Sequence, residues 1–245
     1  MNNITRRIEI FGYPVDITTK KEAVSFAFQR MLDGRGMQVV TINPEMITAA
    51  DKTPKLAEII KNAELVIPDS VGVELAMRRF GVPNAKRLPG IEFSEELMKK
   101  CEENGLKVAF LGGDEETVSL LKPEIAKKYP QLNVVFVRNG YFKEEETPDI
   151  VEQLRISEPN LIFVGMGSPR QEYFINAARP VLDKAIMVGV GGSFDVWAKK
   201  IKRAPWTFRV LGLEWFYRLI TMPERFNRMF PVLPLFLLRI LLSRT

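Results

Sequence analysis

The chain has no histidine and one cysteine, which narrows the chemistry that its 245 residues can perform. Metal sites built from His and Cys are excluded, and a disulfide within the chain cannot form. A general base must therefore be Asp, Glu, Lys, Tyr or Cys101. Cys101 lies in the helical pattern EELMKKCEENG with no activating residue beside it. Packing is its expected role, as for most lone cysteines.

Small and polar residues follow five of the short β-rich runs. Thr41 ends one run and precedes Asn43-Pro44-Glu45, and Pro68-Asp69-Ser70 follows the next. Ligands of open α/β sheets bind beyond the carboxyl ends of the strands, so these segments form a candidate site. Glycines there let backbone N–H groups approach a ligand, and helix N-termini favour a diphosphate. The other three segments are GGD (112–114), GMGSPRQE (165–172) and GGSFD (191–195).

Each of these residues also has a purely structural interpretation. Asn43 before a proline, and Asp69 or Ser70 before the next helical pattern, are typical N-caps. Ser168-Pro169-Arg170-Gln171 has the Ser-x-x-Gln capping pattern. Gly165-x-Gly167 lacks the third glycine of a dinucleotide site, and no P-loop pattern occurs. From the local patterns alone, each of these residues could be a helix cap or could contact a ligand.

Positive charge for a phosphate-bearing ligand has to come from arginines or helix N-termini, because no Asp-x-Asp pair that could hold a divalent ion occurs. The acidic run 144–146 is typical of a solvated helix start. Arginines near the C-terminus fit the wet face of an amphipathic helix equally well. The candidate arginines are Arg87 and Arg170 in the body and Arg218, Arg225 and Arg228 near the C-terminus.

The elements that position these residues alternate along residues 1–198. Such alternation predicts an α/β fold with a mostly parallel, Rossmann-like sheet and helices on both faces. The expected strands are Arg7–Phe11, Met37–Ile42, Leu65–Ile67, Lys107–Leu111, Asn133–Val137, Leu161–Val164 and Ala185–Val190. The expected helices include Lys20–Leu32, Ser70–Phe80, Phe93–Glu103, Glu115–Tyr129 and Thr147–Ser157.

The last fifth of the chain differs in charge and composition. Residues 199–245 contain ten Lys/Arg and two Asp/Glu, a net charge of +8, whereas residues 1–198 contain 25 and 28, a net charge of −3. The longest apolar stretch, Met229–Leu242, has fourteen residues with two prolines and an arginine. A spanning helix needs about 20 apolar residues, so we expect this stretch to lie on a membrane or pack on protein. A Thr221–Glu224 capping box predicts a further helix.

Eight segments in order along nearly the whole chain resemble the WecG/TagA/CpsF glycosyltransferase family. Within that family the resemblance is strongest to the N-acetylmannosaminyltransferases of wall teichoic acid synthesis. Many relatives have glycine where this chain has Lys199. The segments are VTINPEM (40–46), LVIPDSVGV (65–73), RLPGIEF (87–93), AFLGG (109–113), FVGMGSPRQE (163–172), GVGGSFD (189–195), KRAP (202–205) and LGLEWFYRL (211–219).

The resemblance implies a reaction and a location. N-acetylmannosamine (ManNAc) would pass from UDP-ManNAc to the 4-hydroxyl of GlcNAc on undecaprenyl diphosphate, with inversion and without a metal or another cofactor. The α/β body at 1–198 would bind the nucleotide-sugar. A basic, apolar, helical appendage at 199–245 would associate with the cytoplasmic membrane surface. The protein would be cytoplasmic and peripheral on the inner face of the cell membrane, and a homo-oligomer is compatible with this.

The resemblance also assigns roles to single residues. Asp69 would be the general base, and the other residues would contact the sugar, the nucleotide or the diphosphate groups. Thr41 and Asn43 would line the sugar and nucleotide pocket, and Gln171 would contact the substrate. Arg87 and Asp195 would hold the UDP part, and Arg218, Arg225 and Arg228 would reach the diphosphates.

Three other functions fit parts of the pattern. A UDP-sugar-binding module could dock on membranes without transferring a sugar, and a relative could use another UDP-sugar donor. The basic C-terminal segment could also bind nucleic acid, which would make binding sensitive to salt. The leucines and phenylalanines of 229–242 favour lipid over nucleic acid as its partner.

Overall fold

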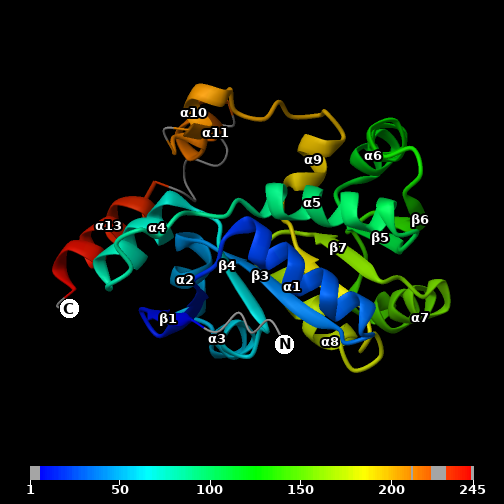
Figure 1. Cartoon of the computed structure of the whole chain (residues 1–245), viewed down its shortest axis with the longest axis horizontal. Helices are drawn as coiled ribbons and strands as arrows, with labels where there is room; N and C mark the ends of the chain where they lie inside the picture. Colours follow the sequence, from blue (N-terminus) through cyan, green and yellow to red (C-terminus); the bar gives the residue numbers. More distant parts are fainter. Residues whose placement is uncertain (1–5, 211, 222–229, 244–245) are drawn as a thin grey trace.

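The central feature of the molecule is a six-stranded sheet in which every neighbouring pair is parallel (Figure 1). The computed structural model describes residues 6–210, 212–221 and 230–243. The strand order is β4-β3-β8-β7-β5-β6, which confirms the predicted α/β fold. The strands are β3 (Met37–Ile42), β4 (Leu65–Pro68), β5 (Lys107–Gly112), β6 (Asn133–Arg138), β7 (Leu161–Gly165) and β8 (Ile186–Gly189).

Helices cover both faces of this sheet, which is why its inner strands are apolar throughout rather than alternating. Val39 and Phe163 pack into the core beneath α1, α5 and α9, whereas Val40 packs beneath α2 and α3, and Val164 beneath α7 and α8. The helices of the body are α1 (Lys20–Leu32), α2 (Pro44–Ala50), α3 (Pro54–Lys61), α4 (Val71–Arg79), α5 (Gly90–Glu103), α6 (Glu115–Lys128), α7 (Thr147–Ser157), α8 (Arg170–Ala178) and α9 (Ser193–Trp197).

The first predicted strand does not join the parallel sheet. β1 (Arg7–Ile10) pairs with β2 (Tyr13–Asp16) in an antiparallel hairpin, which is a separate two-stranded sheet. Phe11 and Gly12 form its turn with φ of 52° and 87°. Asp16 pairs with Arg7 at 2.8 Å and accepts a hydrogen bond from Val66 N at 2.7 Å, so it ties the hairpin to β4 at the edge of the main sheet.

The chain after α9 crosses the carboxyl edge of the sheet before it forms α10 (Trp206–Val210) and α11 (Glu214–Thr221). Lys199 begins this crossing with φ of 55°, a conformation that glycine adopts without strain. Lys200 then pairs with Asp114 at 2.8 Å and with Glu116 at 2.6 Å. The predicted capping box at Thr221–Glu224 extends outside the described residues.

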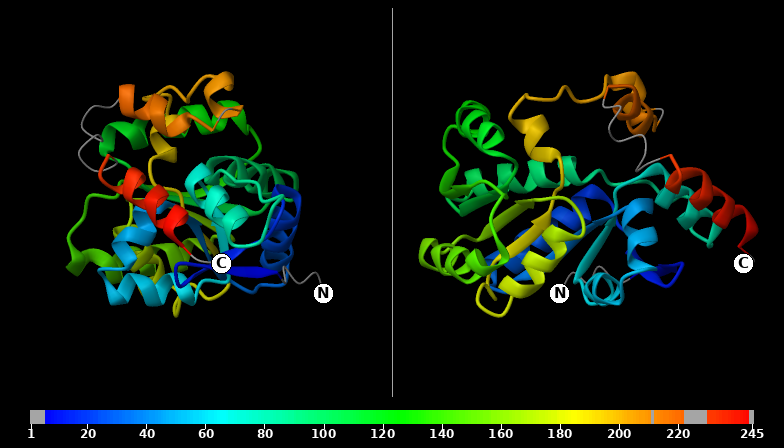
Figure 2. Two further views of the ribbon diagram at one scale, coloured as in Figure 1. Left: turned by 90° about the vertical axis from the view of Figure 1, so that its left-hand side faces the viewer. Right: turned by 180° about the vertical axis from the view of Figure 1, so that it is seen from behind.

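The last helix, α13 (Val232–Leu242), packs on protein with one side of its surface. It contacts α2 and α4, and Figure 2 shows it alongside α4. Phe236 and Ile240 are buried there, and Arg239 stacks 4.1 Å from the ring centroid of Phe11 and pairs with Asp51 at 2.5 Å. Five leucines of the same helix are exposed, at positions 235, 237, 238, 241 and 242. In the described ranges, no helix is long and apolar enough to cross a membrane.

Candidate active site

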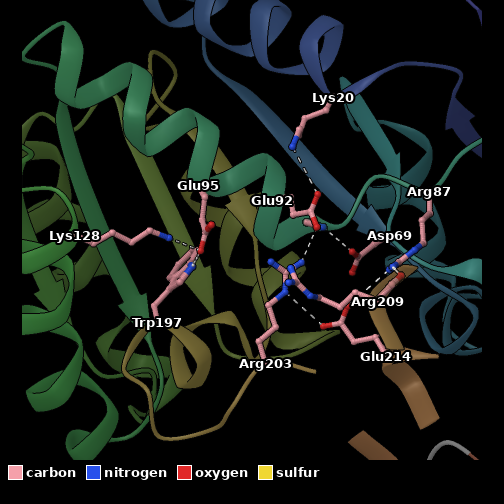
Figure 3. A network of polar contacts seen from close by, with 11 residues as sticks. Lys20, Asp69, Arg87, Glu92, Glu95, Lys128, Trp197, Arg203, Arg209 and Glu214 are labelled. Atoms are coloured by element: carbon pink, nitrogen blue, oxygen red, sulfur yellow. Dashed lines mark hydrogen bonds and ion pairs between the residues drawn. The ribbon is translucent and has the colours of Figure 1, made fainter. Parts of the chain in front are cut away.

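A pocket of about 170 Å³ opens at the carboxyl ends of β3, β4 and β8, where the sequence predicts a ligand site. Asn43, Asp69 and Arg87 line it, so three of the predicted site residues meet there. Figure 3 shows Asp69 and Arg87 together with their polar neighbours. The remaining lining residues are Pro44, Glu45, Ser70, Val71, Pro89, Ile91, Val190, Ser193, Gly212, Glu214, Trp215 and Leu233.

Asp69 occupies the position directly after β4. Its backbone N–H donates to Ile42 O at 3.0 Å, and its Oδ1 accepts from Gly90 N, at the start of α5, at 2.6 Å. Ser70, not Asp69, caps the following helix, because the Ser70 hydroxyl accepts from Val73 N at 3.2 Å. A carboxylate fixed by a backbone N–H at a pocket wall can take a proton from a bound hydroxyl.

Thr41 lies behind Asp69 and does not line the pocket. Its side chain is buried, and Oγ1 donates to Gly189 O at 3.0 Å, which joins the ends of β3 and β8. A Cβ at position 90 would lie 2.7 Å from Thr41 Cγ2, so only glycine lets α5 begin this close to Asp69. Thr41 therefore supports the geometry of the pocket from beneath it.

Asn43 is both a helix N-cap and a residue of the pocket wall. Its Oδ1 accepts from Met46 N at 3.0 Å, which makes it the N-cap of α2. It also lines the pocket, because α2 begins at the carboxyl end of β3. The cap directs the first turn of α2, with its partial positive charge, toward the site.

Arg87 links the pocket to the crossing segment. Its backbone N–H donates to Glu74 Oε2 at 2.9 Å, and its Nη2 donates to Arg209 O at 2.5 Å. Its Nη1 lies 3.8 Å from Glu214 Oε2, and Arg203 lies 3.9 Å from the other oxygen of Glu214 (Figure 3). Arg203 also pairs with Glu92 at the start of α5, at 2.8 Å. This charged cluster ties Arg203, Arg209 and Glu214 to Arg87 and to the start of α5, beside the pocket.

The charges around the pocket are not balanced. Among the described lining residues, Glu45, Asp69 and Glu214 carry negative charge and Arg87 carries positive charge. A diphosphate bound there needs further cations beyond this lining. The predicted Arg225 and Arg228, and the side chain of Arg218 in α11, lie outside the described residues.

Comparison with known proteins identifies the family. The model of the glycosyl transferase WecG/TagA/CpsF family matches residues 8–245, nearly the whole chain. The chain belongs to this family. It is a glycosyltransferase, and its relatives make it a hexosyltransferase.

Two relatives bear the name N-acetylglucosaminyldiphosphoundecaprenol N-acetyl-beta-D-mannosaminyltransferase. The protein from Staphylococcus aureus (strain NCTC 8325) is 34% identical over 241 residues, which cover 96% of this chain and 92% of the relative. The protein from Bacillus spizizenii (strain W23) is 31% identical over 198 residues, which cover 81% and 76%.

Two predicted site residues of the glycosyltransferase lie away from this pocket. Gln171 is buried, its Oε1 accepts from Gly191 N at 3.0 Å, and its Nε2 donates to Glu172 Oε1 at 2.8 Å. Asp195 in α9 accepts from Thr117 Oγ1 at 3.1 Å. The capping interpretation of Ser168 is wrong, because α8 begins after Pro169 without a side-chain cap. Contacts of Gln171 and Asp195 with substrate stay predictions.

Cys101 is a packing residue, as expected. It is fully buried in the core, with its Sγ 3.7 Å from Met31 Sδ, and burial raises the pKa of its thiol to about 12. In the part of the chain that the structure describes, no group of three or more Asp, Glu or Cys side chains could hold a metal ion. Transfer without a metal stays a prediction.

Sequence reasoning missed Arg203, Glu214 and Glu92. All three belong to segments that carry the family resemblance, namely KRAP, LGLEWFYRL and RLPGIEF, so a signal was present. Their pairing was not visible because each partner comes from a different element, far away in the sequence.

Proposed function

We propose that this glycosyltransferase moves N-acetylmannosamine from UDP-ManNAc to the 4-hydroxyl of GlcNAc on undecaprenyl diphosphate, an early step of wall teichoic acid synthesis. The names of the two relatives supply the sugar and the acceptor, and their identity extends over most of the chain. The observation that carries the proposal is the position of Asp69, a carboxylate held by Gly90 N at a pocket wall that also contains Arg87.

In the proposed reaction, Asp69 accepts the proton of the acceptor 4-hydroxyl as the oxygen attacks the anomeric carbon. The bond from that carbon to the UDP oxygen breaks, and UDP leaves with the electron pair. A β-linked product from an α-linked nucleotide-sugar requires inversion, so one displacement and one base suffice. With no histidine in the chain, a carboxylate is the natural base near neutral pH.

The proposed UDP part extends beyond the described pocket, since ligand pockets usually enclose about 300–1,000 Å³. We assign the 170 Å³ volume to the sugar and its immediate contacts. Arg87 would stabilise the negative charge that develops on the departing diphosphate, without a metal. The excess carboxylates of the pocket favour further arginines for the same task, and Arg218, Arg225 and Arg228 are the candidates. Asn43 would hold the sugar, and Asp195 would hold the nucleotide part that extends beyond this pocket. Thr41 and Gln171 would act on the ligand through the backbone of Gly189 and Gly191.

The C-terminal elements suit an acceptor that is anchored in a lipid bilayer. Trp206 and Val210 on α10, Phe216 and Ile220 on α11, and the outer leucines of α13 are exposed. Exposed apolar side chains on the elements of a basic segment are typical of a membrane-binding face. We propose that this face rests on the inner leaflet of the cell membrane while the pocket receives the acceptor head group.

A donor screen tests the proposal. Purified protein would be mixed with several UDP-sugars and a GlcNAc-diphosphate lipid, and UDP release would be measured. We expect release only with the lipid present and fastest with UDP-ManNAc. Faster release with another UDP-sugar would show that this sugar nucleotide, and not UDP-ManNAc, is the donor. UDP binding without release from any pair would favour the non-enzymatic docking module.

A further inference from the structure

A buried carboxyl outside the pocket has no evident structural reason to be there. Glu172 lies in the first turn of α8 and is 2% exposed. Its Oε1 accepts from Gln171 Nε2 at 2.8 Å, whereas Oε2 is buried and makes no hydrogen bond of normal geometry to the described residues. Buried carboxyls are costly, and an apolar side chain of the same size would fill this space at lower cost.

The surroundings of Glu172 disfavour its charged form. Burial raises the pKa of its carboxyl, and hydrogen bonding with Gln171, Ser168 and its own backbone opposes this only in part. A neutral carboxyl still accepts through its carbonyl oxygen, so the bond from Gln171 does not need a charge. What Glu172 supplies to its neighbours is therefore an acceptor at a fixed point.

That acceptor and the Gly191 N–H together fix which way the Gln171 carboxamide points. The oxygen and nitrogen of an amide exchange places when the group turns by half a revolution. With Glu172 accepting, Nε2 has to face Glu172, and Oε1 then faces the Gly191 N–H, from which it accepts at 3.0 Å. Without an acceptor at position 172, the Gly191 N–H alone would hold this orientation, and Nε2 would lose its buried partner.

Gln171 in turn holds one wall of the active-site pocket. A Cβ at position 189 would lie 2.7 Å from Gln171 Nε2, so the amide packs directly on the end of β8. Gly189 O accepts from Thr41 Oγ1 at 3.0 Å, and Val190 and Ser193 line the pocket on either side of Gly191. A shift of Gly191 would therefore move the pocket wall.

We propose that Glu172 is a positioning residue for sugar transfer: together with the Gly191 N–H, it fixes the orientation of the Gln171 carboxamide, which holds the Gly189–Gly191 segment and the pocket wall that this segment carries. The effect on turnover rests on the proposed function, whereas the effect on the segment does not.

Two substitutions separate positioning from packing. Glu172→Gln keeps an acceptor oxygen in a neutral side chain of the same shape, and Glu172→Met keeps the volume but removes the acceptor. We expect Glu172→Gln to stay within about threefold of the unchanged protein in kcat/KM, and Glu172→Met to lose at least about tenfold. Thermal melting should place both variants within about 4 °C of the unchanged protein, because removing a buried carboxyl offsets the loss of the partner of Gln171 Nε2. Equal loss in both variants, or full activity of Glu172→Met, would overturn the proposal.

A double-mutant comparison tests whether the effect passes through Gln171. If it does, Gln171→Met combined with Glu172→Met should be no slower than Gln171→Met alone, within about twofold. Losses that multiply would mean that the two side chains act independently, which contradicts the proposed chain of contacts.

Hydrogen exchange at the Gly191 amide supplies a readout that does not depend on turnover. We expect faster exchange in Glu172→Met and unchanged exchange in Glu172→Gln. Should Glu172→Met fail to fold, Gln171→Met gives the same test, because it removes the acceptor of Gly191 N directly. Unchanged protection of Gly191 in these methionine variants would refute the positioning role. A lack of turnover in the unchanged protein, with the exchange pattern as expected, would refute only the proposed function.

Discussion

Asp69→Asn separates the chemical role of Asp69 from its structural one. Asn keeps an Oδ1 that can accept from Gly90 N, which now donates at 2.6 Å, but it is not a base. Loss of a general base lowers turnover about 10²–10⁴-fold. In barrier height this corresponds to about 3–5 kcal/mol. The binding of UDP should persist, because the nucleotide is held elsewhere in the proposed site.

Asp69→Ala removes the acceptor as well, so it should also lower stability. Leaving the Gly90 N–H without its charged partner costs about 1–3 kcal/mol. For a chain of this length, 1 kcal/mol shifts the melting temperature by about 2–4 °C. We therefore expect Asp69→Ala to melt about 2–12 °C lower and Asp69→Asn to melt within about 2 °C of the unchanged protein.

The assay is UDP release with UDP-ManNAc and a GlcNAc-diphosphate lipid, beside calorimetric binding of UDP and thermal melting. Asp149→Asn, on the exposed first turn of α7, is the matched control and should change neither rate nor melting temperature. A folded Asp69→Asn that turns over at more than about a tenth of the normal rate would show that another group takes the proton.

Three further predictions concern stability and membrane contact. Burial raises the pKa of Cys101 from 9.0 to about 12, so between these pH values the folded chain keeps a proton that the unfolded chain loses. The free energy of unfolding, measured by urea denaturation, should therefore fall as pH rises through this range. The fall should be smaller in Cys101→Ala. Arg239→Met removes the stacking on Phe11 and the ion pair with Asp51, and should lower the melting temperature by about 2–4 °C and speed proteolysis of α13. Leu241→Ser with Leu242→Ser should weaken sedimentation with anionic vesicles at unchanged melting temperature, whereas Leu32→Ser, at a leucine that is also exposed but lies on α1, should not.

The parallel sheet could be predicted because its strands are continuous apolar runs separated by helical spacing. The β1–β2 hairpin could not, since its two-residue turn Phe11-Gly12 lacks the usual Asn-Gly or Asp-Gly signal. The start of α2 was indicated by Asn43 before Pro44, but the extent of that helix was not predicted. The helix α3 was missed, because it is short.

The position of the pocket could be predicted, because ligands of parallel sheets bind at the carboxyl ends of the strands. The contacts that support the pocket could not, because they depend on tertiary packing. Asp69 and Asn43 could be placed because they directly follow strands that turned out to be neighbours. Gln171 was predicted to touch substrate, but its amide is bonded to Gly191 and Glu172, which no local pattern reveals. Lys199 has φ of 55°, a backbone conformation that residues other than glycine rarely adopt.

The last helix, α13, packs on the two helices whose first residues line the pocket. α13 packs on α2 and α4, and these two helices begin at the pocket residues Asn43 and Ser70. A Cβ at Gly72, in the first turn of α4, would lie 3.6 Å from Phe236 of α13 and 2.9 Å from Pro44 of α2. The exposed leucines of α13 are therefore one packing layer from the turn that follows Asp69. Interiors this closely packed transmit displacement, so a bilayer that bears on α13 acts on the same helix turns that shape the pocket.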